Sequence, residues 1–261
     1  MSSTSTDTHA APAITTTAGD QGPHPISLVT TPVLLVAVCA ALWLYLSRLH
    51  LDAIEARALN PRTVTTQVIE HLELVAVSTV LVIAIAVPLG VVLTRPRLRR
   101  LAPIPLAVAN IGQAVPSIGV LVLLAVTVGI GFDKAIIALV LVSALSVLRN
   151  TMVGLQGIDH SLIDAGRGMG LTKTAVLIRI ELPLAVPVML AGVRVALIFN
   201  VSSATLAAFT NAGGLGDLIN TGIAVNRTPI LLTGSVLTAV LALAIDWLAG
   251  LAERFLRPHG L

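Results

Sequence analysis

Long apolar runs bounded by charged residues constrain this sequence more than any other feature. A helix needs roughly 20 mostly apolar residues to cross about 30 Å of hydrocarbon. Six runs meet or approach this length, the third and fifth being long and the fourth short: 26–46, 72–94, 102–130, 134–148, 182–210 and 229–250. Only 11% of the residues are charged, 56% are hydrophobic, and the mean hydropathy is +0.95. We therefore predict an all-α polytopic membrane protein with about six transmembrane helices.

The two ends of the chain differ from this apolar body. Residues 1–25 are rich in Ser, Thr, Ala and Gly and contain no Lys or Arg, so they can neither bury a core nor begin a secretory signal. We predict a disordered tail over 1–25, a transmembrane domain over 26–250 and a cytoplasmic tail over 251–261.

Basic residues predict the orientation, because cytoplasmic loops carry an excess of Lys and Arg. With six spans, ten basic residues share one side: Arg95, Arg97, Arg99, Arg100, Arg149, Arg167, Lys173, Arg179, Arg254 and Arg257. The other side has five: Arg48, Arg57, Arg62, Lys134 and Arg227. We therefore predict that both termini are cytoplasmic. Taken alone, the first run would insert in the opposite orientation, because no Lys or Arg precedes it and three arginines follow it. If this run is not a span, a core of five spans beginning near Leu72 remains.

Several classes of function lack their usual residues. The net charge is only +3 and the basic residues lie between apolar runs, which argues against a nucleic-acid partner. Cys39 is the only cysteine, so an internal disulfide and a cysteine-based metal site are excluded. No GxxxxGK[ST] phosphate loop is present, so the chain cannot bind ATP through that motif. We predict no cofactor, no metal and no enzyme activity.

The third run contains a helix breaker. Pro116 cannot donate to the carbonyl of Gly112, so we expect a kink or break there, with Ser117 and freed backbone groups lining a polar cavity.

The loop over 149–181 is patterned as structure. Ser161 followed by Asp164 resembles a capping box, and Gly170 ends the short helix that this box would begin. Leu162, Ala165, Gly166 and Met169 recur at helical spacing and form an apolar face with small residues at its centre. Thr172 can cap a second helix that runs into the fifth span.

This loop resembles the signature of the permease subunits of type I ABC importers, which reads EAA, three residues, Gly, nine residues, Ile, one residue, Leu, Pro. The matching residues are Asp164, Ala165 and Gly166, then Gly170, Ile180, Leu182 and Pro183, with Asp for Glu and Gly for the second Ala. The resemblance implies the fold of a type I ABC importer permease. It also implies that Leu162 to Gly170 form a coupling helix, which is seated in a groove of an ATPase subunit. The alternative is an amphipathic turn lying on the bilayer.

Five further segments look like the permeases of glycine betaine, carnitine and choline uptake systems. They are 70–72, 87–90, 113–117, 204–209 and 212–216. The resemblance implies import of such an osmoprotectant by alternating access in a cell membrane. The implied partners are an ABC ATPase subunit, an extracytoplasmic substrate-binding protein, a second copy of the permease or a paralogue, and membrane lipid.

Polar residues within the spans suggest a translocation path. Asn110, Gln113 and Ser117 share one helical face, and Asn200, Ser203 and Thr210 share another, so the two faces are expected to meet across the path, near Pro116 and Phe209. The alternative is that these groups form hydrogen bonds that hold the helices together.

Some alternatives stay open at this point. Aromatic residues make up only 3% of the chain, so the spans cannot easily build the aromatic box that holds a quaternary ammonium, and the binding protein is expected to supply high affinity.

Arg194 either pairs with Asp246 or extends alone toward the interface, and His71, His160 and His259 are expected to be interfacial. The same machinery could import an amino acid or another small solute, and an ion-driven secondary transporter is a more distant alternative.

Overall fold

The computed structural model describes residues 25–256, with side chains described for 29–255. Residues 1–24 and 257–261 of the two predicted tails lie outside it. The described chain is helical, with these elements: α1 (Pro25–Ser47), α2 (Ala53–Ala58), α3 (Pro61–Leu93), η1 (Arg99–Leu101), α4 (Pro103–Ala114), α5 (Ser117–Thr127), α6 (Phe132–Gln156), α7 (His160–Gly168), α8 (Lys173–Val176), η2 (Leu177–Glu181), α9 (Leu182–Ala204), η3 (Thr205–Thr210), α10 (Gly216–Ala224) and α11 (Thr228–Leu256).

Within residues 25–256, five helical segments are long and apolar enough to cross a membrane, and a sixth is obtained if the bent pair α4–α5 is counted as one span. The described residues include no strand. The prediction of an all-α protein with about six membrane helices is therefore confirmed.

Two helices are longer than the apolar runs predicted. α3 begins at Pro61 and not near Leu72, because Asn60 caps it by accepting a hydrogen bond from the Arg62 amide and Pro61 is suited to the first helical position. α6 continues past Leu148 to Gln156, where the side chain of Asn150 donates to the carbonyl of Ser146 at 2.8 Å. A count of apolar residues misses such polar helix ends, since polar side chains can continue a helix outside the hydrocarbon.

The break predicted at Pro116 is present. α4 ends at Ala114, α5 begins at Ser117, and the two helices are bent by 101°. Residues 102–130 therefore do not form one straight crossing. Ser117 also does not share a helical face with Asn110 and Gln113 as predicted, because it lies beyond the bend.

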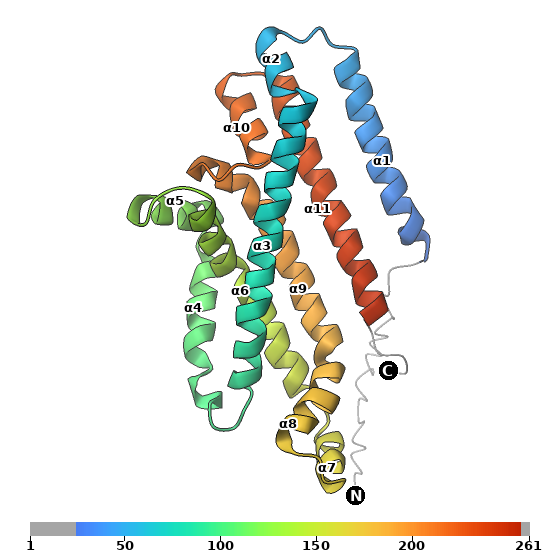
Figure 1. Cartoon of the computed structure of the whole chain (residues 1–261), viewed down its shortest axis with the longest axis vertical. Coiled ribbons are helices and arrows are strands. Elements are labelled where there is room, and N and C mark those ends of the chain that lie inside the picture. Colours follow the sequence, from blue (N-terminus) through green and yellow to red (C-terminus); the bar gives the residue numbers. More distant parts are fainter. Residues whose placement is uncertain (1–24, 257–261) are drawn as a thin grey trace, which may run out of the picture.

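The core is built around α6, which packs against α3, α4, α5 and α9. Small residues let these helices approach closely. A Cβ added at Gly192 on α9 would lie 2.5 Å from Cβ of Asn150, and one added at Gly154 would lie 3.1 Å from the carbonyl oxygen of Ala185. α1, which is mostly exposed, packs against α11 at the edge of the bundle (Figure 1).

The short elements gather at the two ends of the bundle (Figure 1). α7, α8 and the loop between α3 and α4 lie at one end, and α2 and α10 lie at the other. α1 begins, and α11 ends, toward the end that carries α7. The loop over 149–181 therefore reaches one end of the bundle, and the segment over 212–216, directly before α10, lies toward the other.

Candidate functional site

α7 is a separately capped helix at one end of the molecule. Its N-cap is Asp159, not Ser161 as predicted: Oδ1 of Asp159 accepts a hydrogen bond of 2.8 Å from the Ser161 amide. That hydrogen bond is the main reason why the pKa of Asp159 lies below its usual value. Ser161 and Asp164 both lie inside the helix, so the predicted capping box does not form. An Asp two residues before Ser161 was the available signal, since Asp caps helices as well as Ser does.

The helix ends where the sequence predicts. Gly170 has a φ of 87°, its amide donates to the carbonyl of Arg167 at 3.0 Å, and the amide of Leu171 donates to the carbonyl of Gly166 at 3.1 Å. This pair of bonds is a Schellman motif, which needs a residue such as Gly in the left-handed conformation.

The predicted apolar face of α7 is divided between two surroundings. Gly166 is buried against the next segment of the chain, where an added Cβ would lie 2.6 Å from Cδ1 of Ile180 and 3.4 Å from Cγ2 of Val176. Leu162 and Met169 are instead exposed, at 46% and 75%. Two residues of the signature, Gly166 and Ile180, thus form the contact that seats α7, and the apolar side chains of Leu162 and Met169 are left uncovered.

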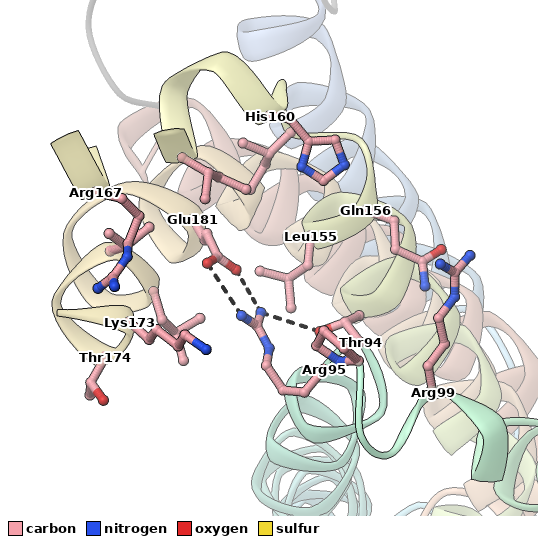
Figure 2. Close-up of a pocket in the computed structure, with 15 residues that line it drawn as sticks. Thr94, Arg95, Arg99, Leu155, Gln156, His160, Arg167, Lys173, Thr174 and Glu181 are labelled. Carbon is pink, nitrogen blue, oxygen red and sulfur yellow. Dashed lines mark hydrogen bonds and ion pairs between the residues drawn. The ribbon is translucent and has the colours of Figure 1, made fainter. Parts of the chain in front are cut away.

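An ion pair not predicted from the sequence joins two loops at this end. Arg95, just after α3, binds Glu181 with both guanidinium nitrogens: Nη1 to Oε1 at 3.2 Å and Nη2 to Oε2 at 2.6 Å (Figure 2). Glu181 is 6% exposed and closes the π-helical turn η2 directly before α9. The arginine-rich loop is therefore fixed to the segment that leads from α7 into the bundle.

The polar residues proposed for a path form hydrogen bonds within the protein, three of them to other helices and Thr210 within its own turn. The side chain of Asn110 accepts from Arg149 at 3.3 Å, and Nε2 of Gln113 donates to Oγ of Ser146 at 3.5 Å. Asn200 is buried and donates to Oγ1 of Thr79 at 2.9 Å. Thr210 is also buried, and its hydroxyl donates to the carbonyl of Ala207 at 2.9 Å.

Ser117 and Ser203 line a cavity together. Their hydroxyls lie 3.2 Å apart, which joins the two predicted faces at one point. The cavity, of about 320 Å³, lies between α5 and α9 and is also lined by one further polar residue, Ser202, and by the apolar Val195, Ile198, Phe199 and Leu206. Pro116 and Phe209 lie nearby in the chain and are exposed, but do not line it.

The opposite end of the bundle brings together two segments that carried the resemblance. His71, at the start of the predicted second span, is 0% exposed, and its Nε2 lies 3.2 Å from the carbonyl oxygen of Val201. Gly214, with a φ of 92°, lies against its ring. His71 is therefore buried between α3 and the part of α9 around Val201, and its interfacial position stays a prediction.

Arg194 and Asp246 form a salt bridge between α9 and α11. Nε and Nη2 of the guanidinium lie 2.6 and 2.8 Å from the two carboxylate oxygens. Of the two alternatives, the paired arrangement is therefore present. Gly250 on α11 lies beside the guanidinium, since a Cβ there would be in van der Waals contact with Nη1 at 3.4 Å. Within residues 25–256, no three His, Cys, Asp or Glu side chains are grouped so that they could hold a metal ion.

Residues 86–258 match the family model of the binding-protein-dependent transport system inner membrane component. The choline transport system permease protein OpuBB of Bacillus subtilis is 38% identical over 192 residues, which are 74% of this chain and 88% of that protein. The carnitine transport permease protein OpuCB of Listeria monocytogenes is 36% identical over 202 residues, 77% of this chain and 92% of that protein. The osmoprotectant import permease protein OsmY of Salmonella typhimurium is 36% identical over 236 residues, which are 90% of this chain and 99% of that protein. The resemblance inferred from the sequence is confirmed.

Solved structures of the MetNI methionine ABC transporter in inward-facing conformations have the same fold. One of them superposes with a TM-score of 0.65 at 27% identity and covers 75% of this chain and 96% of the matched chain. The predicted type I importer permease fold is thus confirmed over most of the described residues.

Proposed function

Because the chain belongs to the family of inner-membrane components of binding-protein-dependent transport systems, we propose that it forms the path for an osmoprotectant in an ATP-driven importer. The glycine betaine, choline or carnitine class is supported by the names of relatives that are 36–40% identical. The chain is a transport component, and ATP hydrolysis belongs to a partner.

The observation that carries the mechanism is the position of α7. It is capped at both ends, rests on Ile180 through Gly166, and exposes Leu162 and Met169 at the end of the bundle. A short helix with uncovered apolar side chains suits a groove in an ATPase subunit, and movement of that subunit would reach α9 through α8 and η2. We assign coupling to the residues proposed from the sequence: Leu162, Asp164, Ala165, Gly166, Met169 and Gly170.

The path itself is proposed at the α5–α9 cavity. Ser117 and Ser203 face it, and Phe199 adds an aromatic side chain that is 38% exposed. Because this surface is open in a single copy, a second permease subunit facing it would enclose the route. The other residues proposed for the path from the sequence are Asn110, Gln113, Pro116, Asn200, Phe209 and Thr210.

The orientation follows from the same assignment. The end with α7 carries Arg95, Arg97, Arg99 and Arg100 as well, and α1 begins and α11 ends toward it, so we propose that this end and both termini are cytoplasmic. The end with α2 and α10 then faces outward, where a substrate-binding protein would dock.

Uptake into cells tests this function. A strain lacking the chain is compared with the complemented strain for labelled glycine betaine, choline, carnitine and methionine, at low and high osmolarity. We expect uptake of at least one quaternary ammonium compound to depend on the chain, and to be lost when Leu162 and Met169 are both replaced by Asp. Uptake of methionine alone would favour the second candidate, an amino-acid importer, which the likeness to the MetNI structures supports.

A further inference from the structure

A basic cavity lies beside α7, apart from the apolar face assigned to the ATPase. Its volume is about 660 Å³, within the roughly 300–1,000 Å³ of small-molecule sites. Its walls come from the loop after α3, the end of α6, α7 itself, and the α8–η2 segment (Figure 2). Four separate elements thus meet around one space.

The charge of this cavity is strongly unbalanced. Arg95, Arg99, Arg167 and Lys173 line it, and Glu181 is the only acidic lining residue. Glu181 already binds Arg95. Among the described residues, neither Arg99 nor Lys173 has a carboxylate within 4.0 Å. The cavity therefore presents uncompensated positive charge, which favours an anion.

Part of the remaining lining is apolar. Leu155 and Val176 are buried, and Ile163 and Leu177 also line the cavity. Such a surface is poorly suited to a fully hydrated anion but suits one that is attached to an apolar body.

The position of the cavity indicates what kind of apolar group the anion is attached to. It begins at Thr94, directly after α3 ends at Leu93, and it includes Gln156, the last residue of α6. Both helices are long and apolar enough to span the membrane. The cavity therefore lies at the level where lipid headgroups meet the ends of the spans.

We propose that this cavity binds the phosphate headgroup of an anionic phospholipid, with Arg99 and Lys173 supplying positive charge from two of its walls and the apolar lining residues against the glycerol region. Because the same cavity is walled by α7 and η2, the bound lipid would hold the coupling helix against the arginine-rich loop. This role rests on the proposed function, whereas the binding itself does not require transport.

Binding is measured on the purified full-length chain in a neutral detergent. Dioctanoyl phosphatidylglycerol, dioctanoyl phosphatidylcholine and inorganic phosphate are titrated separately and followed by microscale thermophoresis. We expect the phosphatidylglycerol to bind at least tenfold more tightly than either of the others, since charge and apolar body are both needed. Replacing Arg99 and Lys173 by Gln should weaken its binding about 10- to 30-fold, as the loss of two basic contacts to anionic lipid predicts.

The chain offers a matched control. Arg97 and Arg100 lie in the same loop but do not line the cavity, so the R97Q/R100Q variant removes the same charge and should lose less than about threefold in affinity. The charge-preserving R99K/K173R variant should bind nearly as the wild type does, which separates charge from folding.

Three results would overturn the proposal. Equal weakening in R99Q/K173Q and R97Q/R100Q would show a diffuse charge effect, and inorganic phosphate binding as tightly as the lipid would show a site for a free anion. Displacement of the lipid by the ATPase subunit would show that the cavity is part of a protein interface. None of these measurements depends on uptake. A negative binding result therefore does not contradict the proposed transport function, and a negative uptake result does not contradict the lipid site.

Discussion

The amide of Gly214 donates a hydrogen bond of 2.9 Å to Oε2 of Glu70, and so ties the loop before α10 to α3 across 144 positions of sequence. The loop conformation depends on glycine at two adjacent positions, because Gly213 and Gly214 have φ values of 80° and 92°. A Cβ at Gly213 would lie 2.5 Å from the same carboxylate oxygen. The carboxylate thus both orders the loop and requires it to lack side chains there.

Replacing Glu70 by Ala should therefore destabilise the folded protein. The loss of a charge-assisted hydrogen bond at a partly buried site corresponds to about 1–2 kcal/mol in the free energy of unfolding. Thermal unfolding in detergent measures the change, and E73A is the control, since Glu73 is an exposed carboxylate on the same helix. Equal melting temperatures for E70A and E73A would contradict the ordering role of Glu70.

Asp217 gives a prediction that depends on pH. Burial raises the pKa of its carboxyl, and the negative charge of Glu70 raises it further. A raised carboxyl pKa means that ionisation destabilises the folded state: the penalty is absent below the ordinary value of 3.8, grows as the pH rises through the folded pKa, and is complete above it. D217N should therefore raise the melting temperature at pH 7, and lose this advantage as the pH falls below 3.8.

Asp52 provides a control of opposite sign. Its pKa is lowered, chiefly by the hydrogen bond from the Glu55 amide, so its ionised form stabilises the fold above 3.8 and that contribution is lost as the pH falls through the folded pKa. D52N should lower the melting temperature at pH 7. If both substitutions moved it in the same direction, the local environments would not be the cause.

The Arg95–Glu181 pair should respond asymmetrically to substitution. In R95Q a carboxylate that is 8% exposed loses its partner, whereas in E181Q the remaining guanidinium is 35% exposed and can reach water. We expect R95Q to cost about 1–3 kcal/mol and E181Q less, with the double variant more stable than R95Q alone. Thermal unfolding of the three variants tests the order, and equal losses in both single variants would contradict it.

The sequence predicts the helices and the break well, because both follow from local chemistry. Apolar run length sets a span, and Pro116 interrupts one whatever its neighbours are. The contact between Gly166 and Ile180 was also accessible, since a fixed spacing between these residues is part of the signature that the chain resembles.

Contacts between segments that are distant in the sequence could not be predicted from the sequence. Arg95 and Glu181 are 86 positions apart, and Asn200 and Thr79 are 121 apart. Which polar group meets which depends on how α3 and α9 pack, and one sequence contains no periodic signal for that. For the same reason, the polar faces predicted to line a path turned out to hydrogen-bond largely within the bundle.

Gly166 offers the sharpest test of coupling, because α7 carries a second glycine in different surroundings. A side chain at Gly166 meets Ile180, whereas a Cβ at Gly168 would have no atom within 4 Å. G166A should be tolerated, since only the flexible end of Ile180 must shift, but G166L should push α7 away from η2.

With its seat lost, α7 can still meet the ATPase but cannot transmit movement to α9. We expect G166L to lower uptake at least about fivefold, the lower end of typical coupling effects, while ATP hydrolysis by the complex and membrane insertion continue. G168A should keep both activities coupled. Uptake and hydrolysis are measured together in proteoliposomes, and unchanged coupled uptake in G166L would exclude the Gly166–Ile180 contact from the route by which ATP hydrolysis drives the spans.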